Sequence, residues 1–414
     1  MIYAKIFALS ESLAFAVVHW HAWALFVLTP VCFILSWWLV KKYAPFARGS
    51  GIPQVMASIE LAAPKKNHLV KYFLSLRIIV VKIIASLVMV IGGGAIGREG
   101  PTIQIAGSVF RKINELLPAW WPKISKRNMI MSGAAAGLAA AFNTPLGGIV
   151  FAVEELTKTH ISYFKTAIFT AVIIAGLTAQ GLAGGYLYLG YPKVDDVSFF
   201  IFFPVVAVGV IAGLGGSYMS LMMIRILDWK DRFKTNKQHL LYLLACSLVI
   251  ASIAFFVSER VIGSGKEIMT TTLFTDDKGS PWYLPLIRTA GPILSFTTGA
   301  PGGVFAPGLS AGASVGSVFA GWFDYSPSNT NLLILAGMAA FLTGITRSPF
   351  TSAILVLEMT ERNNLIFHLL LAGMVASIVA RAVDTHSLYD HLKHRYLHDA
   401  DMLDKKEKVQ THTE

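Results

Sequence analysis

Long apolar segments recur along the whole chain, and they constrain the fold more than any other feature of the sequence. They lie near residues 12–40, 72–97, 129–153, 162–190, 198–224, 239–257, 286–320 and 349–380. A helix of about 18 residues or more crosses a bilayer core of roughly 30 Å. Only 14% of the 414 residues are charged, whereas soluble domains carry roughly 25%. The sequence therefore predicts an all-α polytopic membrane protein.

Lysine and arginine are concentrated in the short connections between these segments. The formal net charge is +11, but the basic residues are not interleaved with the stacking aromatic residues that bind nucleic-acid strands. They follow the positive-inside pattern, in which cytoplasmic loops lie against anionic lipid. We expect a multi-pass protein of the cell inner membrane with both termini in the cytoplasm and no nucleic-acid partner. The first apolar segment is longer than a signal-peptide core, so we expect it to be retained.

Two motifs recur with nearly the same spacing, which indicates an internal repeat. GREGP (Gly97–Pro101) has a counterpart 206 residues further on, GVFAP (Gly303–Pro307). PLGGIVFAVEELT (Pro145–Thr157) resembles PFTSAILVLEMT (Pro349–Thr360), with an offset of 204 residues. Nearly equal offsets between two separated motifs indicate that the chain consists of two related halves.

The duplication defines the expected domain organisation. Residues 1–395 form one transmembrane domain with halves at about 1–191 and 199–395, and residues 396–414 form a short polar cytoplasmic tail, with no C-terminal regulatory domain. Repeated halves with glycine- and proline-interrupted segments at matching positions are typical of transporters, whose broken helices meet at a midplane site. The similarity alone leaves open whether the halves are inverted or parallel.

The stretch GGGAIGREGP (Gly92–Pro101) places two charges beside a glycine-rich turn. Three of its glycines satisfy G-x-G-x-x-G, but that dinucleotide-binding fingerprint needs a soluble βαβ unit, which these apolar surroundings do not supply. The alternative is a helix that begins near Glu99 with proline in its first turn. The unpaired N–H groups and positive dipole end of such a helix form an anion site. We therefore favour anion binding over a nucleotide-dependent enzyme.

Three further helix breaks share this design: GSGIP (Gly49–Pro53), GGVFAP (Gly302–Pro307) and NTP (Asn143–Pro145). If several helix ends converge inside the membrane, their partial charges can hold an anion without the burial of a full positive charge. Taken singly, each motif could instead be an ordinary helix break with no role in ion binding.

Ionisable side chains within apolar segments are functional candidates, because a charge at the bilayer centre costs about 2.5–3.5 kcal/mol on insertion scales. The candidates are Lys82, Glu99 and the pair Glu154–Glu155. Glu154 follows a proline by nine residues, as Glu358 does in the second half, so a structural role at a helix end is open for it. Glu155 has no acidic counterpart and is the more specific of the two. Two roles remain open for Lys82: it could pair with a carboxylate or with carbonyl groups, or it could set the electrostatic potential at an ion site.

The cysteines and histidines predict neither a disulfide framework nor a metal site. Cys32 and Cys246 both lie in apolar runs, where they are expected to be buried packing residues. His19 and His21 lie two residues apart on one expected helix and so face different sides. We expect these histidines to form an interfacial band with neighbouring tryptophans. No metal and no cofactor is expected.

In their order along the chain, these motifs resemble the CLC family of chloride channels and proton/chloride antiporters, in its bacterial branch. The resemblance extends over about residues 35–395 and implies a homodimer in which each subunit has its own anion pathway, built from inverted halves with broken and re-entrant helices. The matching segments are Gly49–Pro53, Gly97–Pro101, Phe142–Leu156, Gly302–Pro307, Ser348–Thr360 and SLYDHL (Ser387–Leu392).

The resemblance also implies a role for individual residues. Glu99 would be the gating glutamate, whose ionised carboxylate occupies an anion position and swings away when protonated. Glu155 would be the internal proton-transfer glutamate. Ser50 and Tyr389 would offer hydroxyl groups to a central dehydrated chloride ion. Backbone N–H groups would come from Val304 and Phe305 at that central site and from Arg98 and Gly100 at an outer site. Supporting residues would be Lys82, Gly49, Gly51, Pro53, Gly97, Pro101, Gly303 and Pro307.

The function implied by this resemblance is exchange of chloride for protons, with a passive voltage- or pH-gated chloride channel of the same family as the alternative. Glu155 favours the antiporter, since channel members lack an acid at that position. Ser50 favours chloride over nitrate or fluoride. The chain departs from the antiporter pattern GSGIPEIE at Gln54–Met56, which removes a carboxylate near Arg98 and leaves the pairing of Arg98 open.

Overall fold

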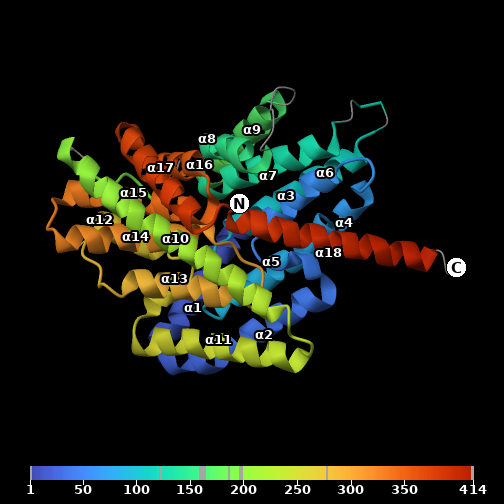
Figure 1. Cartoon of the computed structure of the whole chain (residues 1–414), viewed down its shortest axis with the longest axis horizontal. Coiled ribbons are helices and arrows are strands. Elements are labelled where there is room, and N and C mark those ends of the chain that lie inside the picture. The colour runs from blue at the N-terminus through green and yellow to red at the C-terminus, as the bar shows by residue number, and fades with distance from the viewer. Residues whose placement is uncertain are drawn as a thin grey trace.

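The computed structural model describes residues 2–118, 120–121, 124–157, 165–184, 187–194, 199–276 and 278–411. Over these residues the regular structure is helical apart from two isolated β-bridges (Figure 1). A π-helical turn (Ala152–Thr157) follows α8. The helices are α1 (Ile2–His21), α2 (Leu25–Tyr43), α3 (Ile52–Leu61), α4 (Val70–Phe73), α5 (Leu76–Ile91), α6 (Glu99–Leu116), α7 (Lys126–Phe142), α8 (Pro145–Phe151), α9 (Lys165–Ala183), α10 (Phe202–Lys230), α11 (Asn236–Phe256), α12 (Lys266–Phe274), α13 (Leu284–Phe296), α14 (Phe305–Trp322), α15 (Pro327–Thr346), α16 (Pro349–Thr360), α17 (Ile366–Val383) and α18 (Leu388–Thr411).

Six helical stretches within the described residues are long and apolar enough to span a bilayer. Four of the eight apolar segments are not continuous α-helices. Segment 12–40 divides into α1 and α2, with His21 in an extended conformation between them. Segment 129–153 divides into α7 and α8, segment 286–320 into α13 and α14, and segment 349–380 into α16 and α17. The six stretches are Ile2–Tyr43, Asn67–Ile91, Phe202–Lys230, Asn236–Phe256, Pro327–Thr346 and Ile366–Val383.

Two matching breaks arise where the backbone cannot continue a helix. α7 is followed by Asn143 in the left-handed conformation (φ 59°), and Pro145 then begins α8. α15 is followed in the same way by Arg347 (φ 64°), and Pro349 begins α16. Proline suits the first turn of a helix because its missing N–H is not needed there. The two halves therefore break their helices by the same device.

The helix α15 is a span that the apolar segments of the sequence did not include. Its mean hydropathy of 1.4 is the lowest of the six stretches, yet 94% of it is buried inside the protein. It packs against α14 and α10, and small residues make that packing close. A Cβ atom on Gly312 would lie 2.2 Å from the carbonyl oxygen of Gly337. Glycine at such contacts lets two helix backbones approach closely.

The helices α8 and α16 cap one another through two glutamates from opposite halves. The Glu154 carboxylate accepts hydrogen bonds from the first two N–H groups of α16, at 3.3 and 2.7 Å. Glu358 accepts bonds from the corresponding N–H groups of α8, at 2.9 and 2.6 Å. A carboxylate stabilises a helix N-terminus by satisfying its unpaired donors and its dipole. The structural role left open for Glu154 therefore matches its contacts.

The last helix, α18, is a long polar helix that extends beyond the bundle (Figure 1). Residues 396–411 of the expected tail continue it, whereas residues 412–414, like residues 195–198 of the expected junction between halves, lie outside the described residues. Ion pairs join it to the first half, including Arg48–Asp399 at 2.6 Å and His68–Asp404 at 2.9 Å. Hydrogen bonds from Lys408 and His68 lower the pKa of Asp404, so this carboxylate is charged at neutral pH.

Candidate functional site

Two backbone bridges bring the three signature turns to one point in the protein. Gly97 and Gly303 form an antiparallel bridge by exchanging N–H···O=C bonds of 2.8 and 2.7 Å. Gly49 donates its N–H to the Ala300 carbonyl and accepts a bond from the Gly302 N–H, both at 3.1 Å. Turns that are distant in the sequence therefore meet through their main chains.

Helices α3, α6 and α14 begin directly after these turns. Pro53 lies at the start of α3, and Pro101 and Pro307 each lie at the third residue of their helix. The first N–H groups of a helix have no partner within the helix, and they carry its positive dipole end. Three helix N-termini therefore converge here, which is the arrangement on which the predicted anion site depends.

Gly51 is required where the first turn meets α6. Its φ of +107° is unfavourable for other residues, and a Cβ atom there would lie 2.7 Å from the Gly100 carbonyl oxygen. Gly100 faces Ser50 in turn, because a Cβ atom on Gly100 would lie 2.3 Å from the Ser50 hydroxyl oxygen. Ser50 is thereby set against the first turn of α6.

Ser50 and Tyr389 bring two buried hydroxyl groups to these helix N-termini. Ser50 is 1% exposed and Tyr389 is fully buried, and their hydroxyl groups lie close to one another. Apart from one another, neither hydroxyl has a hydrogen-bond partner among the described residues. The Tyr389 ring stacks on Phe305, the first residue of α14, with 6.1 Å between ring centroids. A buried donor left unpaired costs about 1–3 kcal/mol, so a bound anion would satisfy both groups at this position.

The Glu99 carboxylate is fully buried where α6 and α14 begin. It lies beside the backbone N–H of Ala306, and a Cβ atom on Gly97 would lie 2.2 Å from its Oε2 atom. Main-chain N–H groups of Glu99 itself and of Ala306 are the donors next to the carboxylate, and no side chain among the described residues donates to it. A negative group is favoured at two helix N-termini, and the side chain can leave without breaking a hydrogen bond to another side chain of the described residues.

Lys82 supports the first turn from α5. Its ammonium group is fully buried and donates to the carbonyl oxygens of Ala47 at 2.9 Å and Gly49 at 2.7 Å. Of the two interpretations left open for Lys82, pairing with carbonyl groups is the one observed. The contact holds the main chain directly before Ser50.

Arg288 on α13 is the counterpart of Lys82 in the second half, 206 residues further along. Its guanidinium group is fully buried and donates to the Arg260 and Ile262 carbonyl oxygens at 3.0 and 3.1 Å. A Gly-Ser-Gly turn (residues 263–265) follows, and both of its glycines have positive φ, as Gly49 and Gly51 do. The sequence analysis did not single out Arg288, although its offset equals that of the GREGP repeat.

Gln54 replaces the acidic residue expected after Pro53. It is fully buried, its Oε1 atom accepts the Gly51 N–H at 3.0 Å, and its Nε2 atom donates to the Arg48 carbonyl at 2.5 Å. A neutral amide therefore closes the start of α3. Arg98 turns elsewhere, since its guanidinium group donates to the carbonyl of Ala4 in α1 at 2.6 Å.

Glu155 lies on the π-helical turn after α8. It is 2% exposed, and its Oε2 atom accepts a hydrogen bond of 2.5 Å from the Ser348 hydroxyl group. A small internal gap, too narrow for a water molecule, is lined by Glu155, Ser348, Phe151 and Phe305. Because the Phe305 ring also stacks on Tyr389, this gap lies next to the converging helix N-termini.

Comparisons with known proteins agree with this geometry. The family model described as "Voltage gated chloride channel" matches residues 32–381. The chain is 28% identical over 402 residues to "H(+)/Cl(-) exchange transporter ClcA" from Citrobacter koseri, covering 95% of this chain and 82% of the relative. It is 29% identical over 388 residues to the protein of the same name from Salmonella paratyphi B, covering 90% and 80%.

Solved structures show the same fold. A slow cyanobacterial Cl-/H+ antiporter matches with a TM-score of 0.79 at 24% identity, covering 96% of each chain. A CLC-type fluoride/proton antiporter matches with a TM-score of 0.78 at 21% identity, covering 94% of this chain and 92% of the other. At these identities the likeness concerns the fold alone.

Proposed function

This chain belongs to the voltage-gated chloride channel (CLC) family, and from that premise we propose that it is an antiporter that exchanges chloride for protons. Its fold is the all-α polytopic fold of that family, with two inverted-repeat halves and broken helices. The observation that carries the proposal is the presence of two buried carboxylates near the start of α14: Glu99 beside the Ala306 N–H and Glu155 beside Phe305.

In this proposal chloride binds where α3, α6 and α14 begin. The Ser50 and Tyr389 hydroxyl groups donate to a dehydrated ion, and the main-chain N–H groups of Val304 and Phe305 contribute the remaining polar contacts. Their burial without any other hydrogen-bond partner among the described residues supports this role for the hydroxyl groups. Partial charges bind the ion without a fixed counter-charge, so that the ion can also leave.

Glu99 acts as the gate in this proposal. Its ionised carboxylate competes with chloride for the outer position near the N–H groups of Arg98 and Gly100. Protonation removes the charge that the two helix ends stabilise, so the side chain swings out and an anion enters. The contacts of its carboxylate are main-chain N–H groups at the helix ends, and no side chain among the described residues donates to it, which supports such a movement.

Glu155 receives and releases the proton next to Phe305. Its burial and its bond to Ser348 hold the carboxylate at the small gap that Phe305 also lines. A proton that passes from Glu155 to Glu99 opens the gate, and the same event admits chloride. Coupling follows because one group, Glu99, carries the proton and blocks the anion in turn.

The same proposal covers assembly and location. We infer a homodimer in a bacterial inner membrane, with chloride and protons as its substrates, no cofactor, and residues 1–395 as a single transmembrane domain. The positive-inside distribution of basic residues supports cytoplasmic termini, which would put α18 and its basic residues on the cytoplasmic face.

The test is whether ion movements are coupled in liposomes that contain the purified protein. A chloride gradient alone should drive protons against their own gradient. Brisk chloride flux without proton movement would make the protein a passive pore of the same family.

A further inference from the structure

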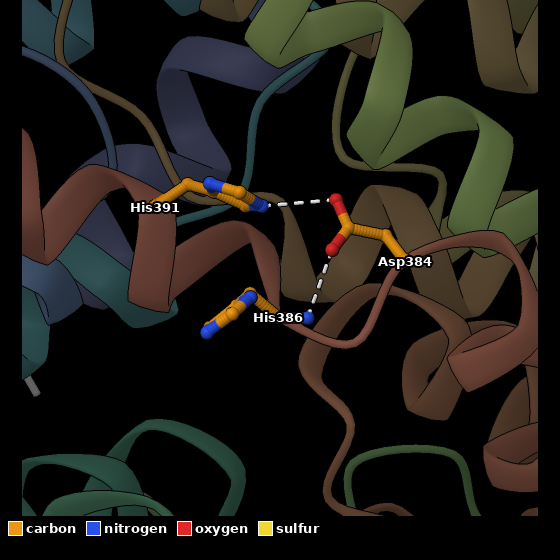
Figure 2. Close-up of side chains that lie close together, drawn as sticks. All are labelled: Asp384, His386 and His391. Carbon is orange, nitrogen blue, oxygen red and sulfur yellow. Dashed lines mark hydrogen bonds and ion pairs between the residues drawn. The ribbon is translucent and has the colours of Figure 1, made fainter.

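The turn between α17 and α18 brings together one carboxylate and two imidazole rings. Asp384 follows the last residue of α17, His386 lies in the turn, and His391 lies in the first turn of α18 (Figure 2). One oxygen or nitrogen atom from each side chain lies within 4.8 Å of the others. The sequence analysis expected no metal site and overlooked these residues, because they flank a helix boundary instead of sharing one helix face.

The Asp384 carboxylate is held by the main chain of His386 and by the ring of His391, while the Thr385 hydroxyl group lies 3.1 Å from the Nδ1 atom of His386. Its Oδ1 atom accepts the main-chain N–H of His386 at 2.9 Å. The main-chain carbonyl of Asp384 accepts a bond of 3.2 Å from the Arg347 Nε atom. Its Oδ2 atom lies 2.9 Å from the His391 Nε2 atom. The carboxylate is therefore oriented toward the ring of His391.

The three side chains are open to water. The side chains of Asp384 and His391 are 25% and 35% exposed, and His386 is exposed. The two imidazole rings lie 5.6 Å apart, centre to centre. An ion can therefore reach the cluster from the aqueous phase, and the exposed ring of His386 can rotate toward it.

Two imidazole nitrogens and a carboxylate oxygen are the donor set that Zn²⁺ and related ions prefer, whereas Ca²⁺ and Mg²⁺ prefer oxygen alone. Zinc bonds of about 2.0–2.2 Å put neighbouring ligand atoms of a tetrahedral site about 3.3 Å apart. The Asp384–His391 pair is already near that spacing, and rotation of His386 brings the third ligand in. Water would complete the coordination.

We propose that Asp384, His386 and His391 form a binding site for one divalent transition-metal ion of the Zn²⁺ class. The ion binds between the Asp384 Oδ2 and His391 Nε2 atoms and replaces the hydrogen bond that joins them in this structure. The main-chain N–H of His386 remains on the other carboxylate oxygen and keeps the ligand oriented, as outer contacts do in metal sites.

Occupation of this site would restrain the start of α18. Tyr389 lies between His386 and His391 in the chain, and Thr385 of the same turn lines a cavity of about 630 Å³ with Glu154 and Arg347. Metal binding ties the end of α17 to the helix that carries the Tyr389 hydroxyl group. If the protein transports chloride as proposed, this restraint on Tyr389 should slow chloride flux when the metal is bound.

The binding test uses the full chain, purified without a polyhistidine tag, and titrated with Zn²⁺ by calorimetry. We expect one site that weakens by about ten- to a hundredfold or more in the His386→Ala and His391→Ala variants. The control is His398→Ala, which removes another exposed histidine from α18 and should bind Zn²⁺ as the wild type does. Equal Zn²⁺ affinity in the wild type and both cluster variants would overturn the proposal.

Separate measurements report whether each variant folds and whether metal binding affects chloride flux. His386 is exposed in a turn, so His386→Ala decides the binding question even if His391→Ala does not fold, as judged by size-exclusion chromatography. In liposomes, Zn²⁺ should reduce wild-type chloride flux severalfold and should have little effect on the flux of His386→Ala. Zn²⁺ bound at the cluster with unchanged wild-type flux would overturn the link to Tyr389. Chloride flux reports this even if protons do not move, so the test stands apart from the antiport proposal.

Discussion

Gly97 and Gly303, 206 residues apart in the sequence, form a mutual pair of main-chain hydrogen bonds of 2.8 and 2.7 Å. Each precedes the N-terminus of a broken helix, α6 or α14. Glu99 is the acidic residue that distinguishes the first turn from the second, and its carboxylate lies over Gly97. The repeat thus supplies a symmetric frame for an anion, to which one half adds a competing negative charge.

Gly97→Ala should displace the Glu99 carboxylate, because the new methyl group would lie 2.2 Å from its Oε2 atom. Since the side chain end can move, we expect a folded protein whose gate is biased open. The measurement is chloride flux at neutral pH, which should rise severalfold. Gly303→Ala is the comparison, since its Cβ atom would meet main-chain atoms of Gly100 and Gly97 at 3.1 and 3.2 Å and not the Glu99 carboxylate; an equal rise in that variant would contradict the account.

Glu99→Gln should mimic the protonated gate, because the amide keeps the shape of the side chain and removes its charge. Chloride flux should then lose its pH dependence, and proton movement should stop. Flux measured in liposomes between acidic and neutral pH checks this result. A steep pH dependence that survives the substitution would assign the gate to another group.

Glu155→Gln should abolish proton movement while chloride still flows, because an amide at this position cannot release a proton beside Phe305. Glu154→Gln is the matched control on the adjacent residue, whose carboxylate caps α16. That variant should lose about 0.5–2 kcal/mol of stability, as expected for a helix cap, but keep the ratio of protons to chloride. Coupled transport in Glu155→Gln would remove the proposed role of that residue.

Lys82→Met should weaken chloride binding, because the Ala47 carbonyl loses its side-chain donor and the Gly49 carbonyl, directly before Ser50, keeps only the Gly302 N–H. A buried carbonyl left unpaired costs about 1–3 kcal/mol. Chloride titration calorimetry and thermal unfolding measure the two effects. Arg288→Met makes the corresponding change in the second half and should lose stability while it retains chloride affinity. A similar loss of affinity in both variants would show that Lys82 has no specific role at the anion site.

Local chemistry explains which parts of the fold the sequence could predict. Helices break at Asn143, Pro145 and the glycine turns because of the backbone preferences of these residues. The broken helices and the repeat can therefore be predicted from a single sequence. The apolar segments of the sequence missed α15, because its hydropathy is modest. This helix is nonetheless almost completely buried by tertiary packing, which the sequence does not reveal.

The site was predictable to the same extent. The turns and both glutamates carry recognisable motifs, whereas the placement of their side chains depends on contacts between distant segments. Arg288 could have been found from its offset to Lys82. The exchange of caps by Glu154 and Glu358 needs three dimensions, since each glutamate serves a helix about 200 residues away. The Asp384 cluster was missed because a turn and a helix start contribute to it together.

The sign of proton movement under a chloride gradient tests the central claim most directly. Liposomes are loaded with chloride, diluted into low chloride at equal pH, and clamped at zero membrane potential with potassium and valinomycin. An antiporter carries protons inward as chloride leaves, so the external medium should become alkaline, and Glu155→Gln should abolish the change. Chloride release with no alkaline shift in the wild type would contradict proton-coupled exchange.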